Sequence, residues 1–517
     1  MSTEFLESTN KGILLEFDAG PFVVDQDATI TNTNSVLSAA IEIDFISGAS
    51  LTNFGTIEGE FEGIYGEISE SIIHNQRGTI SGLETGLQLF GSGNTIVNAT
   101  FSEISGETAI RNTGFGSAIL NSGEIVGDIN GVGIVDDGED NYILNRGTIF
   151  GGTAIVVESE DVEIVNWQSI TGRGVGINFH VDSVGGVIQN NGFLSGGGDV
   201  RSIAVMGNDT AQKVVNNATI EGKVLLEGGD DLFDGRNGDA ADVRGGEGND
   251  TLLGGDSFDR LFGNAGDDSI SGGGREDLLS GGDGNDTLDG GEGDDRLFGL
   301  NDDDLMFGGA GNDEMVGGQG NDTMSGQSGQ DTLFGRKGDD SLSGGQDNDT
   351  LSGDTGNDTL RGDEGDDSVV GGSGQDMIFG GAGADILQGE SGNDTLDGGS
   401  GNDLIDGGTG RDVMRGGEGN DVFEFNTLRD SAVALSRTDV ILDFERGQDK
   451  LDIGDLNDAG MFTLVDGFTG SGSAEFRIAI DATRGSHVLI DADGDGRADT
   501  AFLVEDVFNL STGDFVL

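Results

Sequence analysis

Hydrophobic residues recur at fixed intervals along most of this chain. Over residues 227–424 one apolar residue stands at every ninth position, from Leu252 to Phe423. Glycine and polar residues fill most of the remaining positions, so each unit can supply only a short strand with one inward side chain. A strict short period is typical of stacked repeats. Two units, eighteen residues in all, would close one coil with a strand on each side.

A longer and looser repeat fills residues 28–226. Its unit reads Asn, about three residues, an apolar residue, one residue and Gly, as in the run from Asn53 to Gly59. The units are 21 to 26 residues apart, which fits one coil of a parallel β-helix with asparagines stacked at its turns. The unit asparagines are Asn32, Asn53, Asn75, Asn98, Asn121, Asn145, Asn166, Asn190 and Asn216.

These patterns predict an all-β chain of four segments. We expect an N-terminal cap over 1–27, a parallel β-helix of about nine coils over 28–226, a parallel β-roll over 227–424, and a β-rich domain over 425–517. No stretch has the period of a useful amphipathic helix. No run approaches the roughly 20 apolar residues of a membrane span.

Composition then points to chemistry. The chain has 96 acidic and 25 basic residues, a formal net charge of −71. Such a charge argues against nucleic acid, whose binders carry basic surfaces, and against anionic membranes. There is no cysteine, which excludes disulfides, thiolate ligands and cysteine nucleophiles. The partner that this charge favours is a multivalent cation.

An aspartate stands two residues before each apolar residue of the nine-residue units, and a glycine stands five residues before each aspartate, in all twenty copies. Carboxylates beside flexible loops whose carbonyls can face a ligand favour Ca²⁺ over Mg²⁺. Zinc would need histidine or cysteine, and the units have neither. The candidate metal ligands are Asp250, Asp259, Asp268, Asp277, Asp286, Asp295, Asp304, Asp313, Asp322, Asp331, Asp340, Asp349, Asp358, Asp367, Asp376, Asp385, Asp394, Asp403, Asp412 and Asp421.

Stacking would place Asp250 under Asp268, and Asp259 under Asp277, at the spacing of about 4.8 Å between neighbouring strands. Two rows of ten aspartates leave nine gaps each, so we expect about eighteen calcium ions at full occupancy. Calcium would bind more weakly where a loop glycine is replaced. The second glycine is replaced at Asn264, Leu300, Gln327, Arg336, Asp354, Asp363 and Glu390, and the third at Ser257, Arg275, Asp302 and Asp347.

The nine-residue pattern Gly-Gly-x-Gly-x-Asp-x-apolar-x, as in the run from Gly281 to Asp289, resembles the repeats-in-toxin (RTX) family of hemolysin-type calcium-binding repeats. The resemblance implies a parallel β-roll with calcium between successive turns. It also implies that the row aspartates and loop carbonyls are the ligands.

The tail resembles the C-terminal part of secreted serralysin-type proteins, in residues 420–425, 439–444 and 447–452. The acidic-plus-apolar residues 514–517 resemble the ending read by type I (ABC) exporters. The resemblance implies an extracellular protein, exported unfolded and folding on calcium outside the cell. Residues 1–24 show no cleaved signal peptide, which agrees.

Two roles stay open for the N-terminal repeat. We favour a structural or adhesive role at the cell surface or on extracellular polysaccharide. The alternative is a polysaccharide lyase or epimerase, because parallel β-helices joined to RTX repeats occur in such enzymes. Arg77, Arg111, Arg146 and Arg173 are scattered, with Arg146 and Arg173 only weakly suggesting one face, so we assign no catalytic residue.

One further acidic motif lies in the tail. The run from Asp491 to Gly496 resembles the start of an EF-hand loop, but its twelfth position is Phe502 instead of glutamate. Asp499 could substitute as a ligand. Calcium binding and a solvated acidic turn are both open interpretations of this run.

Overall fold

The computed structural model describes residues 4–6, 13–15, 22–24, 29–31, 39–48, 50–180, 185–197, 201–428, 438–456 and 462–517. Nearly all of its regular structure is β-strand, which confirms the all-β prediction. The helical elements among these residues are two 3-10 turns, η1 (Gly454–Leu456) and η2 (Thr512–Asp514). No helix in the described part of the chain is long and apolar enough to cross a membrane.

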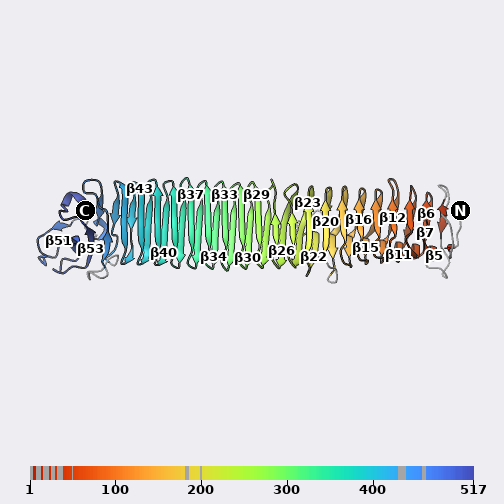
Figure 1. The fold of residues 1–517 in the computed structure, drawn as a ribbon, viewed down its shortest axis with the longest axis horizontal. Coiled ribbons are helices and arrows are strands. Elements are labelled where there is room, and N and C mark those ends of the chain that lie inside the picture. The colour runs from red at the N-terminus through yellow and green to blue at the C-terminus, as the bar shows by residue number, and fades with distance from the viewer. Residues whose placement is uncertain are drawn as a thin grey trace. The chain divides into compact units, whose positions relative to one another are not determined.

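The chain divides into two compact units, Met1–Gly273 (unit 1) and Gly274–Leu517 (unit 2). In unit 1 short parallel strands stack into two sheets (Figure 1). The first sheet contains β1 (Glu4–Leu6), β3 (Phe22–Val24), β6 (Ser50–Asn53), β9 (Ile72–Asn75), β12 (Thr95–Asn98), β14 (Ala118–Asn121), β16 (Tyr142–Asn145), β18 (Glu163–Asn166), β20 (Gly186–Asn190), β23 (Gln212–Asn216), β25 (Leu232–Asp234) and β27 (Thr251–Leu253).

The second sheet of unit 1 runs along the opposite side of the coils and bends within its longer strands. Its strands are β2 (Ile13–Leu15), β4 (Thr29–Thr31), β5 (Ala39–Ser47), β7 (Thr56–Gly59), β8 (Glu62–Ser69), β10 (Thr79–Gly82), β11 (Thr85–Phe90), β13 (Glu103–Asn112), β15 (Glu124–Asp136), β17 (Thr148–Val157), β19 (Ser169–Phe179), β21 (Phe193–Ser195), β22 (Ile203–Asn208), β24 (Thr219–Gly228), β26 (Asp239–Glu247) and β28 (Arg260–Ala265).

The asparagines of unit 1 stack as the sequence predicts. Each cross-strand partner of a unit asparagine is the next unit asparagine, from Asn53–Asn75 to Asn190–Asn216. Each Nδ2 donates to the next Oδ1 over 2.8–3.0 Å. The unit isoleucines, such as Ile57 and Ile149, are fully buried between the sheets. Asn32 lies outside the described residues.

Unit 2 repeats with eighteen residues per coil, the period expected for two units. Leu297 pairs with Leu279 one coil earlier and with Met315 one coil later, and all three are fully buried. One sheet contains β31 (Thr287–Glu292), β33 (Leu305–Ala310), β35 (Thr323–Ser328), β37 (Ser341–Gln346), β39 (Thr359–Glu364), β41 (Met377–Ala382), β43 (Thr395–Gly401) and β46 (Val413–Gly419). The other contains β30 (Leu278–Asp283), β32 (Arg296–Asn301), β34 (Glu314–Gln319), β36 (Thr332–Lys337), β38 (Thr350–Thr355), β40 (Ser368–Gly374), β42 (Ile386–Gly392), β44 (Leu404–Asp406), β45 (Thr409–Gly410) and β47 (Val422–Glu424). β29 (Ser269–Gly274) spans the boundary between the two units.

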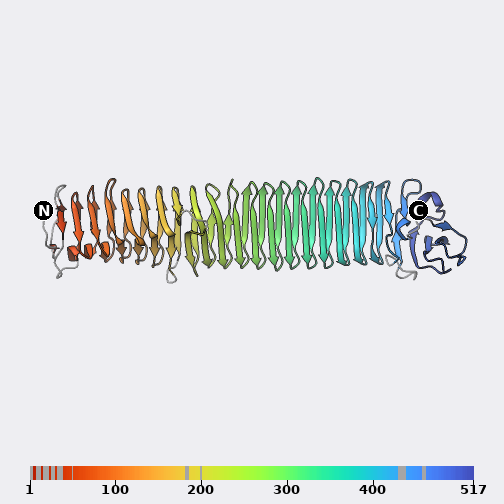
Figure 2. The same ribbon diagram turned by 180° about the vertical axis from the view of Figure 1, so that it is seen from behind.

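The tail of unit 2 closes its last coil (Figure 2). β48 (Asp439–Ile441) pairs with β46, and β49 (Lys450–Asp452) pairs with β47. β51 (Glu475–Asp481), β52 (Gly485–Asp491) and β53 (Thr500–Glu505) form an antiparallel meander, and β53 joins β48. β50 (Thr463–Leu464) pairs with β51 and β54 (Phe515–Val516) with β49. The rings of Phe425 and Phe502 stack at 3.9 Å between these parts.

Candidate metal centre

The aspartates form buried rows in which each residue is tied to the next coil. In unit 2 the backbone N–H of each row aspartate from Asp277 to Asp403 donates to Oδ1 of the aspartate eighteen residues later, over 2.7–3.0 Å. In unit 1 Asp250 donates in this way to Asp268, as the stacking predicts. In addition, Oδ2 of Asp259 accepts the N–H of Gly255 over 2.9 Å. All twenty side chains are buried.

The second oxygen of these carboxylates, Oδ2, is buried as well. In most of the row aspartates Oδ2, unlike Oδ1, accepts no hydrogen bond from the described residues. A buried carboxylate oxygen without a partner is costly unless a cation neutralises it. The aspartates with such an Oδ2 are Asp250, Asp295, Asp304, Asp313, Asp322, Asp331, Asp340, Asp349, Asp358, Asp367, Asp376, Asp385, Asp394, Asp403, Asp412 and Asp421.

The glycine five residues before each aspartate leaves space beside this oxygen. A methyl group on Gly290 would lie 2.5 Å from Oδ2 of Asp295 and 2.5 Å from the carbonyl oxygen of Gly308, one coil later. The carboxylate oxygen and the carbonyl oxygen therefore converge on one face of Gly290. The same steric exclusion explains why glycine stands at this position in every repeat.

Ionisation of the row aspartates is unfavourable, as their raised pKa values indicate. Burial, and after it the carboxylates one coil away, raises the pKa of Asp304 to about 8 and that of Asp313 to about 7. The backbone N–H that each Oδ1 accepts lowers the pKa only in part. Ionised rows at neutral pH therefore need positive charge nearby.

These residues fit calcium. The donor set is carboxylate and carbonyl oxygen, with no histidine or cysteine in the repeats, which suits a hard cation. Oδ2 of a row aspartate and the glycine carbonyls beside it would hold the ion. A bound calcium ion would supply the positive charge that the Oδ2 atoms otherwise lack.

Most residues that replace a loop glycine still have the backbone conformation typical of glycine. All seven residues at the second glycine position have positive φ, from 69° to 91°, and so do Arg275, Asp302 and Asp347 at the third. Ser257 does not share this conformation. Positive φ is unfavourable for residues with a Cβ, above all for Leu300 at 91°. The coil geometry therefore overrides local preference at these positions.

The rows extend beyond the candidates found in the sequence. The N–H of Asp231 donates to Oδ1 of Asp250, and Asp231 is itself buried, with a pKa that burial raises to about 8. At the other end Asp412 and Asp421 donate to Asp439 and Asp449. Their offsets of 19, 27 and 28 residues differ from the eighteen of the regular coils. Asp231 lies in an incomplete copy of the nine-residue unit, Gly228–Phe233, which precedes the regular copies in the sequence.

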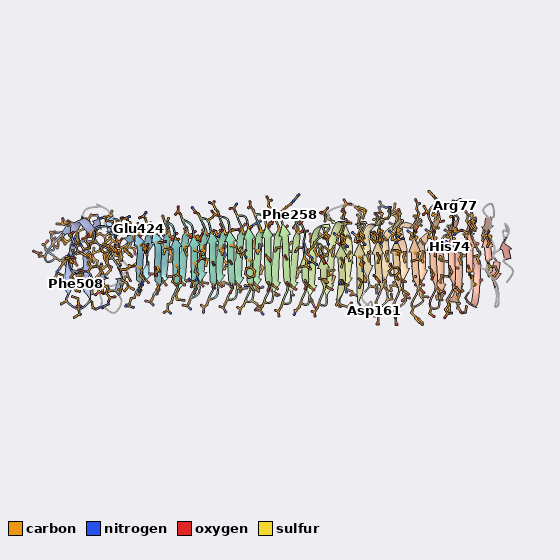
Figure 3. The ribbon with its side chains drawn as sticks, turned by 45° about the horizontal axis from the view of Figure 1, so that its top comes forward. His74, Arg77, Asp161, Phe258, Glu424 and Phe508 are labelled. Atoms are coloured by element: carbon orange, nitrogen blue, oxygen red, sulfur yellow. The ribbon has the colours of Figure 1, made fainter. Side chains whose placement is uncertain are left out.

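The position just before each row aspartate carries a second, exposed ladder. Here the N–H donates to the side-chain oxygen one coil earlier, as from Asn312 to Asp294 and from Asp339 to Asn321. This ladder explains the frequent Asn and Asp at that position, which the sequence pattern alone leaves unassigned. Phe258 interrupts the series in unit 1, and 52% of its surface is exposed (Figure 3).

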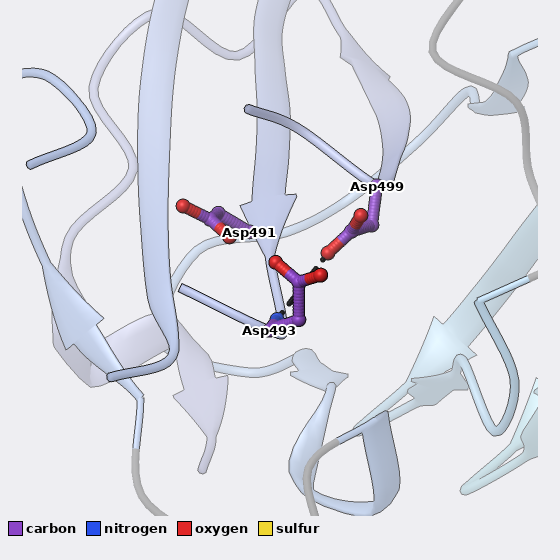
Figure 4. Close-up of side chains that lie close together, drawn as sticks. All are labelled: Asp491, Asp493 and Asp499. Carbon is purple, nitrogen blue, oxygen red and sulfur yellow. Dashed lines mark hydrogen bonds between the residues drawn. The ribbon is translucent and has the colours of Figure 1, made fainter. Parts of the chain in front are cut away.

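The acidic motif of the tail forms a compact turn (Figure 4). Carboxylate oxygens of Asp491, Asp493 and Asp499 lie within 4.8 Å of one another, and Asp495 is not part of this group. Asp491 is buried, and its oxygens accept the N–H groups of Gly494 and Gly496 at 2.7 and 2.8 Å. The backbone therefore satisfies the buried carboxylate of this turn.

Comparison with known proteins agrees with the repeat and the tail. The family model of the RTX calcium-binding nonapeptide repeat (4 copies) matches residues 244–279, 271–306, 280–315 and 316–351, and that of the peptidase M10 serralysin C terminal matches 353–517. A search of curated proteins found no match.

Two solved structures are similar to part of the chain. Both are solution structures of subunits of the mannuronan C5-epimerase from Azotobacter vinelandii. The AlgE6R3 subunit is 34% identical, with 28% of this chain and 80% of that chain covered and a TM-score of 0.23. The AlgE6R2 subunit is 31% identical, with 29% and 91% covered and a TM-score of 0.22.

Proposed function

Because this chain is an RTX protein with a serralysin-type C-terminal region, we propose that its aspartate rows bind calcium and that calcium binding drives the folding of the repeats. The chain leaves the cell through a type I (ABC) exporter and folds in the extracellular medium. There it serves as a structural or adhesive protein on cell surfaces or polysaccharide. The protein would consist of four segments, a cap (1–27), a β-helix (28–226), a calcium-binding β-roll (227–424) and a C-terminal secretion domain (425–517).

One observation carries the calcium proposal, the row of buried Oδ2 atoms facing glycine carbonyls. Asp331 and Asp349, for example, each have one oxygen bound to a backbone N–H and one without a partner. Repeats with such rows are too acidic to fold unaided, and binding energy becomes folding energy when the ion is present.

A calcium titration of the full chain tests the proposal. We expect far-UV circular dichroism to gain β signal cooperatively with calcium and not with magnesium at the same concentration. Isothermal titration calorimetry counts the ions bound. A chain that is fully folded in chelator, or equally responsive to magnesium, contradicts the proposal.

A further inference from the structure

In unit 1 the residue directly after each ladder asparagine lies in a turn, and these turns stack from coil to coil. Arg146 follows Asn145 and Trp167 follows Asn166, and these two asparagines are cross-strand partners. The N–H of Trp167 also donates to the carbonyl of Asn145 over 2.8 Å. Arg146 and Trp167 therefore occupy the same position in successive coils, about 4.8 Å apart along the stack.

Asn191 and Asn217 continue this position, and with Asn237 of the following turn they form a ladder of exposed amides. Nδ2 of Asn217 donates to Oδ1 of Asn191 over 3.0 Å, and Nδ2 of Asn237 donates to Oδ1 of Asn217 over 3.3 Å. The amides are thus held at fixed spacing beyond Trp167. Each keeps further donor and acceptor capacity toward solvent.

A groove of about 600 Å³ opens at this corner. It is lined by the exposed aromatic ring of Phe101, the polar side chains of Arg146 and Gln168, and the carboxylates of Glu103 and Glu124. Arg77, two residues after Asn75, lies at the upper edge of unit 1 in Figure 3, and Asp161 lies at the lower edge.

Two aromatic residues are exposed at this corner, Phe101 in the groove and Trp167 next to its lining residue Gln168. Phe101 has 88% of its surface exposed and a φ of 68°, so it combines a strained backbone with a solvated ring. Trp167, the single tryptophan of the chain, is 53% exposed. Strain that gains nothing for the core points to a function at the surface.

We propose that this corner, from Phe101 through Arg146 and Trp167 to the amides of Asn191 and Asn217, binds a strand of neutral polysaccharide laid along the coils. Aromatic faces pack against the apolar faces of sugar rings, and amide and guanidinium groups hydrogen-bond their hydroxyls. The regular coil spacing repeats these contacts along an extended chain of sugars. The inference rests on the adhesive part of the proposed function and names its ligand class.

The charges around the groove favour a neutral polysaccharide over an acidic one. The groove holds two carboxylates, Glu103 and Glu124, against the single guanidinium of Arg146. The chain around it carries a net charge of −71. A polyuronate would be repelled by this field, whereas an uncharged strand would not.

Trp167 makes the test local, because its fluorescence reports on this corner alone. The full calcium-loaded chain is titrated with neutral hexasaccharides of β-1,4-glucan, β-1,3-glucan, α-1,6-glucan and β-1,4-mannan, and with oligomannuronate. We expect at least one neutral hexasaccharide to shift the Trp167 emission and to give a matching calorimetric isotherm. Phe101→Ala should weaken that affinity about tenfold, or about 1.4 kcal/mol.

Phe115→Ala is the matched control, since Phe115 is 62% exposed but does not line the groove. It should leave the affinity unchanged. The proposal is overturned if no neutral hexasaccharide binds, if oligomannuronate binds in their place, or if Phe101→Ala and Phe115→Ala behave alike. Circular dichroism of the same samples shows whether calcium-driven folding holds, so failure of the glycan site and failure of the calcium proposal are told apart.

Discussion

The backbone N–H of Gln212 donates to Oδ1 of Asp231 over 2.5 Å, and this bond links a neutral residue to the anionic row. Earlier in unit 1 the same pattern runs from Asn94 to Oγ of Ser117 and from Ser117 to Oδ1 of Asn141. Later it runs from Asp231 to Asp250. One backbone geometry therefore serves two chemistries, and only the second needs a cation.

The asparagine ladder of unit 1 predicts that the early coils stay folded without calcium. In chelator we expect hydrogen–deuterium exchange to stay slow for the coils between Asn53 and Asn190, whose ladder is satisfied by amides. The coils between Asp295 and Asp403 should exchange rapidly, because their carboxylates repel. Mass spectrometry of peptides from both regions measures this. Equal loss of protection in both would contradict the separation.

Asp331→Asn separates charge from hydrogen bonding in a row. The asparagine Oδ1 can still accept the N–H of Asp313, which now binds Asp331 over 2.8 Å. We expect a loss of bound calcium near this coil and a higher calcium midpoint for folding, because an anionic ligand is gone. Calorimetric ion counting and circular dichroism measure both. Asp339→Asn, at an exposed position, is the control and should change neither.

Gly290→Ala tests the space beside Oδ2. The added methyl group would lie 2.5 Å from both Asp295 Oδ2 and the Gly308 carbonyl, so these oxygens must separate. We expect a cost of about 1–3 kcal/mol in the calcium-loaded state, as for other overpacked sites, and weaker calcium binding. Gly467→Ala is the control, because nothing lies within 4 Å of its added methyl. Equal calcium-loaded thermal midpoints for the two variants would rule out the steric role.

Leu300→Gly should stabilise the roll. Leu300 holds a φ of 91° and is 46% exposed, so glycine relieves backbone strain while losing little buried surface. The gain should be about 1 kcal/mol, seen as a higher thermal midpoint in saturating calcium. Leu305→Gly, on an ordinary strand and 37% exposed, should lower the midpoint instead. A lower midpoint for both would show that strain at Leu300 is unimportant.

Asp136 gives unit 1 a pH dependence that does not involve the rows. Burial raises its pKa from 3.8 to about 6, against hydrogen bonds from Asn112, Asn141 and Ser159 that lower it. A raised folded pKa means that the neutral form favours folding. Stability is therefore full below about pH 4 and falls as pH rises toward and through about 6, by roughly 3 kcal/mol in total.

Asp136→Asn should remove that loss, because an amide can accept from Asn112 and donate to Ser159 without charge. Thermal unfolding followed by Trp167 emission between about pH 3.5 and 7 compares the variant with the parent chain. Asp137→Asn, at an exposed position, should keep the slope of the parent. A parent chain with a flat profile would refute the role of Asp136.

The sequence was sufficient for the features that repeat. Leu297 and its counterparts lie in the core because the period fixes their side, and the amides from Asn53 to Asn216 stack because their spacing matches one coil. Asp439 and Asp449 could not be placed by counting, since loops of extra residues separate them from the rows. The groove at Phe101 was not predicted either, because it joins turns whose adjacency depends on the number of residues in each coil.

The buried row bonds all point the same way, since each N–H finds its acceptor on the following coil, as Asp295 does on Asp313. In the exposed ladder each N–H donates to the preceding coil instead, but these groups can hydrogen-bond to water until their partner is in place. A chain delivered with its C-terminal end first thus lays down every costly acceptor before the donor that needs it. Delivered in the opposite order, each newly buried N–H would wait for a partner not yet present. The rows give the molecule a direction of growth, so that assembly from one end is easier than from the other.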